Sequence, residues 1–317
     1  MSSARHPPAR WRGVALITAM ILVTLATVVA VALGTRTALT ARRQVAAVAP
    51  EHALQYAIGA ESLAAYVLRE DNGPQDTLQD SWTQPYGPVE AAPGVMLEAQ
   101  LLDEQSRFNL NTLVDAQGAI DPQAVAIFSR LLELVGLETK WAPLLADWID
   151  SDVLATQDGG EDALYLSQQP GHRAANQALT STSELLQLPG FGRERFLKLA
   201  PHVAALPPEA RRINVCLASG VVLDALAATN ESAGRGVEYS LMTGEALAQA
   251  RSRGCFPGVS VLQATLGPQI EGRVGESSQY FGLRSGIQLG QARFAMYSLL
   301  KRDGGRVLTV LRQFGTE

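Results

Sequence analysis

The hydrophobic pattern begins with one long apolar run near the N-terminus. Val14 to Leu33 reads VALITAMILVTLATVVAVAL, twenty consecutive residues without a charge. At about 1.5 Å per residue, a helix of that length spans roughly 30 Å, the thickness of the hydrocarbon core of a bilayer. The pattern therefore predicts a membrane-spanning helix directly after a short basic leader.

Three kinds of N-terminal segment fit this run. One is a permanent single-pass anchor, and another is a cleaved secretory signal, because Ala30-Val31-Ala32 has the small-x-small pattern of a cleavage site. The third is a prepilin leader that ends at Gly13, so that Val14 becomes the first residue of the mature chain. Arginines on both sides of the run leave its orientation open.

Beyond the membrane the pattern predicts a long helix and then a strand. The helix continues from Arg36 to Glu70, and Pro50 is expected to kink or interrupt it. Residues 71–94 contain four prolines and are expected to form an irregular connection. Val95 to Leu102 reads VMLEAQLL, which is typical of a strand.

A helical pattern then extends over more than 150 residues and interrupts a small β region. It includes Pro122–Gly136, Ser183–Leu188 and Val221–Ala228. Strand character returns in Gln279–Leu289 and Arg306–Phe314, with Gln291–Lys301 between them. The pattern predicts an α+β fold in which a helical block divides the strands.

The composition indicates the charge and the number of domains of the chain beyond the membrane. Removal of the first thirteen residues takes away three arginines and moves the formal charge from -5 to -8. The remaining chain is long enough for two modest cores, and two domains are expected. Its two cysteines, Cys216 and Cys255, would face an oxidising space if exported, so a disulfide is favoured and two buried thiols remain the alternative.

The densest group of chemically active side chains is acidic. Six carboxylates lie within sixteen residues, in Asp147–Asp152 (DWIDSD) and Asp158–Asp162 (DGGED). Oxygen ligands in an irregular loop suit calcium, although the spacing is not that of an EF-hand. A solvated acidic loop explains the pattern equally well, and a buried Trp148 would favour the metal site.

Two further patterns lie in the helical block. Leu188-Pro189-Gly190-Phe191-Gly192 precedes a helical stretch, Arg193–Leu199, as in helix-hairpin-helix modules that hold a DNA phosphate. In an acidic chain a tight packing turn is the simpler explanation. The order basic, apolar, Asn, apolar occurs twice, in Arg107–Leu110 and Arg212–Val215.

No catalytic motif accompanies these patterns. The four histidines are scattered, and no nucleophile elbow, zinc-binding histidine pair or phosphate-binding loop is present in the sequence. We therefore expect a protein that is not an enzyme.

Together these segments resemble one family, the large minor pseudopilin of type II secretion, general secretion pathway protein K. The resemblance covers nearly the whole chain and keeps the order and spacing of its motifs. They are Arg12–Leu16, Arg107–Asn111, Asp147–Asp152, Gly160–Asp162 with Tyr165, Ser183–Leu185, Ile213–Val215, and Tyr280–Phe281 with Ser298–Leu300.

The resemblance implies a pilin-like long N-terminal helix and a small antiparallel sheet, with a large inserted α-helical domain of helix-hairpin-helix or SAM-like type. The implied organisation is a leader (1–13), a transmembrane part (14–34), a pilin-like core in two parts (35–105 and 276–317) and the insertion (106–275). In ordinary pilins the fifth mature residue is Glu. Here it is Thr18. Members of the K class share this departure from Glu, and a neutral residue suits a cap better than a repeating shaft subunit.

The resemblance also implies the setting. Prepilin peptidase would cleave between Gly13 and Val14, the new N-terminus would be methylated, and the chain would span the inner membrane once with its C-terminal domain in the periplasm. There it would cap the tip of a pseudopilus with the minor pseudopilins of the I and J classes, to initiate assembly and support export across the outer membrane, without nucleic acid. Calcium is implied in the insertion, at Asp150, Asp152, Asp158, Glu161 and Asp162.

The alternative function is a membrane-anchored helix-hairpin-helix protein that captures DNA outside the cytoplasm. It requires a basic patch near Arg193, Arg195 and Lys198.

Overall fold

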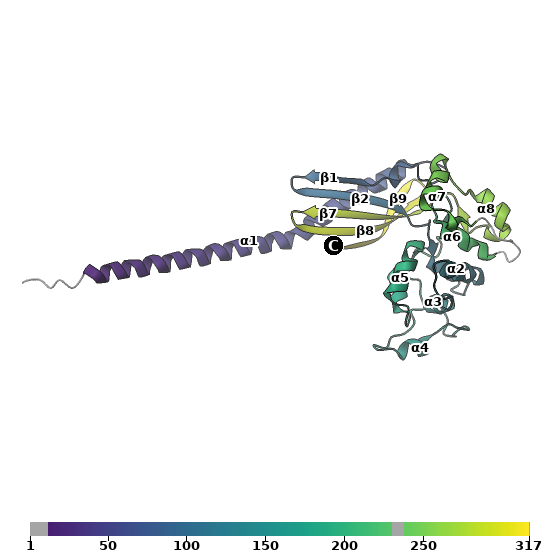
Figure 1. Cartoon of the computed structure of the whole chain (residues 1–317), viewed down its shortest axis with the longest axis horizontal. Helices are drawn as coiled ribbons and strands as arrows, with labels where there is room; N and C mark the ends of the chain where they lie inside the picture. Colours follow the sequence, from purple (N-terminus) through teal and green to yellow (C-terminus); the bar gives the residue numbers. More distant parts are fainter. Residues whose placement is uncertain (1–11, 230–237, 317) are drawn as a thin grey trace, which may run out of the picture. The chain divides into compact units, whose positions relative to one another are not determined.

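The computed structural model describes residues 12–229 and 238–316 (Figure 1). Its first element is helix α1, Arg12–Glu70, with Gly13 and Val14 in the first turn. The remainder of the predicted leader, residues 1–11, lies outside the described residues. Residues up to Gln55 and residues from Tyr56 onward form two separate compact units.

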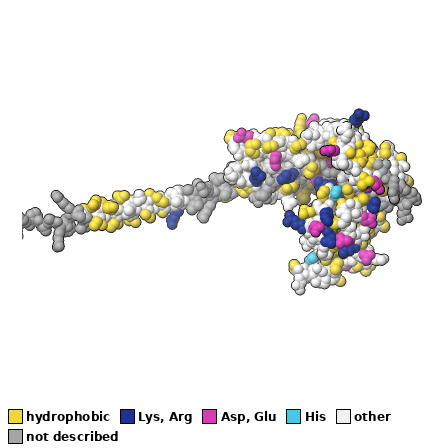
Figure 2. Space-filling model, viewed as in Figure 1, with side chains coloured by type: hydrophobic (Ala, Val, Ile, Leu, Met, Phe, Trp, Pro, Cys, Tyr) yellow, Lys and Arg dark blue, Asp and Glu magenta, His cyan; other side chains and the backbone are white. Residues whose placement is uncertain are grey.

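The N-terminal unit carries the apolar span. Ala15–Thr37 has a mean hydropathy of 2.7, and none of its most apolar window is buried. Figure 2 shows this part of α1 covered with hydrophobic side chains. The expected interruption at Pro50 is wrong, because α1 continues through it. Pro50 removes one backbone hydrogen bond, but strong helix formers on both sides continue the helix.

The second unit contains a five-stranded antiparallel sheet in the order β1-β2-β7-β8-β9. Its strands are β1 Tyr86–Ala92, β2 Val95–Asp103, β7 Tyr280–Leu289, β8 Ala292–Asp303 and β9 Arg306–Thr316. The α+β class and the predicted strands at β2, β7 and β9 are confirmed.

Strand β1 corrects the expectation of an irregular connection across residues 71–94. It contains Pro88, which is tolerated because β1 lies at the edge of the sheet and need not donate every backbone hydrogen bond. Its pairing with β2 is irregular on both sides of Val89–Glu90. An edge strand of this kind has little alternation of apolar and polar residues, so the sequence pattern did not reveal it.

The C-terminal turns of α1 pack on one face of this sheet. Ala64 and Leu68 join a buried cluster with Phe281 and Leu300. The ring of Trp82 contacts that of Phe281 edge-on, with centroids 5.1 Å apart. The pilin-like arrangement of a helix on an antiparallel sheet therefore has its own apolar core.

Most of the regular secondary structure in the insertion between β2 and β7 is helical (Figure 1). Its α-helices are α2 Pro122–Leu134, α3 Trp141–Ile149, α4 Asp162–Leu166, α5 Gly192–Leu199, α6 Gly220–Ala225, α7 Gly244–Ala250 and α8 Val259–Leu266. The predicted helix at Ser183–Leu188 is a 3-10 helix, Thr182–Gln187, which begins with a capping box between Ser181 and Glu184. A second buried cluster, in which the rings of Phe108 and Phe128 stack, forms the core of the insertion.

Short parallel strand pairs explain the repeated Asn pattern. β3 (Phe108–Asn109) pairs with β4 (Val203–Ala204), and β5 (Ile213–Asn214) pairs with β6 (Val274–Gly275). The side-chain oxygens of Asn109 and Asn214 each accept a hydrogen bond, at 3.1 Å, from the backbone N–H two residues later. Both asparagines therefore turn the chain out of a strand in the same way.

Asn214 also fixes the insertion to the sheet. Its side-chain amide donates to the Asp103 carboxylate at 2.7 Å and to the Ser278 hydroxyl at 3.0 Å. Asp103 ends β2 and Ser278 precedes β7, so one side chain of the insertion binds both points where the chain leaves and re-enters the sheet. Burial raises the pKa of Asp103 to about 7, opposed by the hydrogen bonds it accepts from Ser278, Asn214 and Gln105.

The two cysteines form a disulfide, Cys216–Cys255, across a sequence separation of 39 residues. Beside it, the buried Arg251 donates to the backbone carbonyls of Phe256, Val215 and Ala218. The bridge and the arginine therefore fix the same segments after β5 and after α7.

Candidate functional site

The acidic segment is organised by a buried aspartate at the end of α3. The Asp147 carboxylate accepts hydrogen bonds from the backbone N–H groups of Thr156 and Gly160, both at 2.9 Å, and from the Thr156 hydroxyl at 2.7 Å. A Cβ on Gly159 would collide with this carboxylate. Glycine is therefore needed at position 159 for the loop to wrap closely around Asp147.

Three other carboxylates converge at this loop. Asp150 follows α3, and Glu161 directly precedes α4. One oxygen from each of Asp150, Asp152 and Glu161 lies within 4.8 Å of the others. Asp150 and Glu161 are buried, whereas Asp152 is exposed. The group has the size of a cation site that is open on one side.

The electrostatics of this group are unfavourable without a cation. Burial, followed by repulsion from Asp152 and Asp147, raises the pKa of Asp150 to about 6. Burial, followed by repulsion from Asp150 and its neighbours, raises the pKa of Glu161 to about 7. A divalent cation would relieve both the repulsion and the desolvation.

The buried oxygens also fit a metal. Asp150 Oδ1, both carboxylate oxygens of Glu161 and the amide oxygen of Asn176 are buried without a hydrogen-bond partner. Asn176 lies beside the group, because its amide nitrogen donates to the Asp152 carbonyl at 2.6 Å. Carboxylate and amide oxygens are calcium ligands, so the residues present fit that ion. The sequence pattern did not predict Asn176 as a ligand. Its backbone has a positive φ of 46°, which is uncommon for a residue other than glycine.

Two of the residues carried over by resemblance do not join the converging group. Asp158 is exposed on the loop and does not belong to the converging group. Asp162 accepts a hydrogen bond from the Ala174 backbone N–H at 3.0 Å and pairs with Arg173 at 3.7 Å. The expected aromatic support is present, because buried Trp148 packs against Tyr165 with ring centroids 4.7 Å apart.

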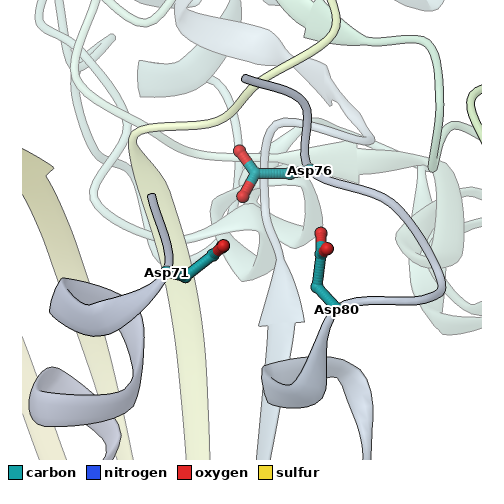
Figure 3. A group of neighbouring side chains, drawn as sticks. All are labelled: Asp71, Asp76 and Asp80. Atoms are coloured by element: carbon teal, nitrogen blue, oxygen red, sulfur yellow. The ribbon is translucent and has the colours of Figure 1, made fainter. Parts of the chain in front are cut away.

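A second acidic group lies after α1. Asp71, Asp76 and Asp80 point toward one another (Figure 3) and place one oxygen each within 4.8 Å. Here Arg302 supplies the positive charge, since it pairs with Asp71 at 3.2 Å and with Asp76. Among the described residues, none of these three carboxylates has a buried oxygen without a partner. This group is better explained as an internal ion-pair network.

The glycine hairpin packs helices. Gly190 and Gly192 have φ values of 81° and 72°, which favour glycine, and α5 starts at Gly192. Phe191 between them contacts Trp141 edge-on at 5.2 Å.

The basic residues required for DNA capture are largely neutralised. Arg195 pairs with Glu138 at 2.9 Å, and Lys198 pairs with Glu194 at 3.2 Å. The DNA-binding alternative is therefore not supported.

The family model and the similar proteins carry the same description. Residues 106–208 match the family described as "Type II secretion system (T2SS), protein K". The chain is 32% identical to the type II secretion system protein K of Pseudomonas aeruginosa, over 96% of this chain and 92% of the relative. It is 31% identical to the Klebsiella pneumoniae protein of the same name, over 96% and 97% of the two chains.

The fold agrees with a solved structure. A chain in the crystal structure of the GspK-GspI-GspJ complex from the enterotoxigenic Escherichia coli type 2 secretion system superposes with a TM-score of 0.73. The match covers 87% of this chain and 100% of that chain, at 28% identity.

Proposed function

Because this chain belongs to the type II secretion system protein K family, a minor pseudopilin family, we propose that it caps the tip of the pseudopilus and supports protein export across the outer membrane. The observation that carries the proposal is a pilin-like core with a large insertion between β2 and β7. The insertion forms a bulky head, and a head of this size obstructs the addition of further subunits above it. The work of such a protein is assembly rather than catalysis.

The N-terminal helix suits that position. Its apolar span, Ala15–Thr37, is long enough to cross an inner membrane once, with the remaining chain in the periplasm. If prepilin peptidase cleaves after Gly13 and the new terminus is methylated, Thr18 is the fifth mature residue. Its hydroxyl donates to the Ala15 carbonyl of its own helix, at 3.0 Å. A neutral side chain there cannot supply the carboxylate that pairs with a neighbour's terminal amine in an ordinary pilin shaft.

The proposed partners are the minor pseudopilins of the I and J classes. The support is the superposition on a chain from a GspK-GspI-GspJ complex. No role for nucleic acid is proposed.

Calcium is proposed as the cofactor of the insertion. Asp150, Asp152 and Glu161 would hold it, and Asn176 offers a fourth side-chain oxygen. Bound calcium would neutralise the group and fix the loop between α3 and α4.

The experiment that tests the function is recovery of the native protein from host membranes, followed by N-terminal sequencing and intact mass. A methylated N-terminus at Val14 is expected, together with co-purification of the I- and J-class pseudopilins. A start at Leu33 would mean a secreted protein, and a retained leader would mean a simple anchor. Either result would refute the proposal.

A further inference from the structure

Strand β9 is an unprotected edge of the sheet. Within residues 12–229 and 238–316 it pairs only with β8, and none of its described side chains, at 306–315, is buried. Leu308 and Val310 are 55% and 47% exposed. An edge strand presents a row of backbone N–H and C=O groups, and apolar side chains on such an edge favour pairing with another strand.

A groove lies beside the start of this edge. It has a volume of about 320 Å³ and is formed by two segments, residues 62–69 of α1 and residues 305–308. Ala65 and Val307 contribute apolar side chains to its lining, and Tyr66 is 52% exposed. The groove and the edge share Arg306, Val307 and Leu308, so they form one continuous surface.

The charge of this surface is opposite to that of the chain. Among the described residues that line the groove, Arg69 and Arg306 are the charged ones, although the whole chain carries a formal charge of -5. Arg69 makes a long contact of 3.5 Å with Glu70, and both side chains are more than half exposed. Arg306 has no ion pair within the part of the chain that the structure describes, even with Asp303 opposite it across the turn. The surface is therefore complementary to carboxylates.

We propose that the groove and the outer edge of β9 bind an extended, acid-bearing segment of a partner pseudopilin. Its backbone pairs with β9, its apolar side chains cover Leu308 and Val310, and its carboxylates meet Arg69 and Arg306. Strand addition to an exposed edge is a recurrent mode of peptide recognition. A second copy of this chain is a poor occupant, because its own β9 would bring Arg306 and Arg312 against the same positive edge.

This inference rests on the proposed assembly with the I and J classes, and its test separates the two. Full-length wild-type chain and the variant R69E/R306E are titrated with the purified I- and J-class pseudopilins of the same host, in detergent, at low and high salt. We expect the variant to bind about tenfold more weakly at low salt and to lose most of the salt dependence. L308N is expected to weaken binding at both salt concentrations.

The matched control is R193E/R253E, which makes the same change of charge at two exposed arginines outside this surface. Thermal unfolding of each variant checks that the fold is retained. If R69E/R306E binds like wild type, or if the control is weakened equally, the docking surface is wrong while the partners stand. If the wild-type chain binds neither pseudopilin, the proposed partners are wrong, and this inference fails with them.

Discussion

The ion pair between α1 and β9 offers the sharpest test of the fold. Glu61 is a buried residue of α1. Its carboxylate accepts hydrogen bonds from the hydroxyls of Ser298 at 2.7 Å and Thr309 at 2.8 Å, and two from the Arg312 guanidinium, at 2.8 and 2.7 Å. Burial alone would raise the pKa of Glu61, but the bonds from Arg312, Ser298 and Thr309 outweigh it and hold the pKa below its usual value.

Replacement of Glu61 by Ala removes all four bonds. Loss of one partner of a buried ion pair costs about 3 to 5 kcal/mol, but Arg312 is half exposed, and water can solvate it again. The Ser298 hydroxyl remains buried, and an unsatisfied buried donor costs about 1 to 3 kcal/mol. We therefore expect E61A to lower the free energy of unfolding by about 3 kcal/mol, and Tm by about 6 to 12 °C.

The assay is thermal unfolding of the full chain in detergent, followed by circular dichroism. E133A removes an exposed glutamate with an ion pair on α2 and is expected to change stability by less than about 0.5 kcal/mol. The contribution of Glu61 should be present above the unfolded pKa of about 4.3 and lost as pH falls through the lower folded pKa. If E61A and E133A have the same Tm at pH 7, the Glu61–Arg312 ion pair does not hold α1 on the sheet.

Three further predictions follow from the site, the junction and the membrane span. Calcium at 100 times its Kd should raise stability by about 2.7 kcal/mol in scanning fluorimetry, and D150N/E161Q should abolish that rise. Because the pKa values of Asp150 and Glu161 are raised, the contribution of these groups to the calcium-free fold is lost as pH rises toward 7, whereas protons compete with calcium at low pH. At one fixed calcium concentration the rise should therefore be larger at pH 8 than at pH 5.5, and a rise independent of pH would contradict the site. N214A leaves the Asp103 carboxylate and the Ser278 hydroxyl without their shared donor, so it should lower the free energy of unfolding in urea by about 2 to 4 kcal/mol. An unchanged urea midpoint would show that Asn214 does not fix the insertion to the sheet. L22R should oppose membrane insertion by about 2.5 to 3.5 kcal/mol, and normal partitioning into the membrane fraction would show that the span does not cross it.

The sequence predicted the elements whose periodicity is strong. β2, α2 and β7 agree with the pattern because each buries one regular face. The apolar span agrees because its apolar run is uninterrupted. β9, none of whose described side chains is buried, agrees because it is rich in β-branched residues. β1 was missed because it buries almost nothing and, unlike the other edge strand β9, contains a proline, Pro88. The continuous helix at Pro50 was missed because a single breaker is overridden by the many helical residues around it.

The candidate site was predicted only at the level of the segment. The acidic run predicted only the segment, and the resemblance implied five ligands in it. Asp150, Asp152 and Glu161 converge, whereas Asp158 is exposed on the loop and Asp162 contacts the Ala174 backbone. The acidic run also could not identify Asn176, which follows Glu161 by fifteen residues and reaches the group through the fold. Ligand sets of this kind depend on how a loop closes, which spacing along the chain does not determine.

The repeated asparagine explains how one sheet can hold so large an insertion. Asn109 binds carbonyls of Pro207 and Ala210 within the insertion, whereas Asn214 reaches Asp103 and Ser278 at the sheet. The same turn is therefore used once to close the insertion on itself and once to attach it. Because the attachment is made of directional hydrogen bonds between buried groups, it fixes orientation in a way that apolar contact alone would not. A cap needs a head whose orientation is constant, since only then does it present the same face to its partners at every assembly.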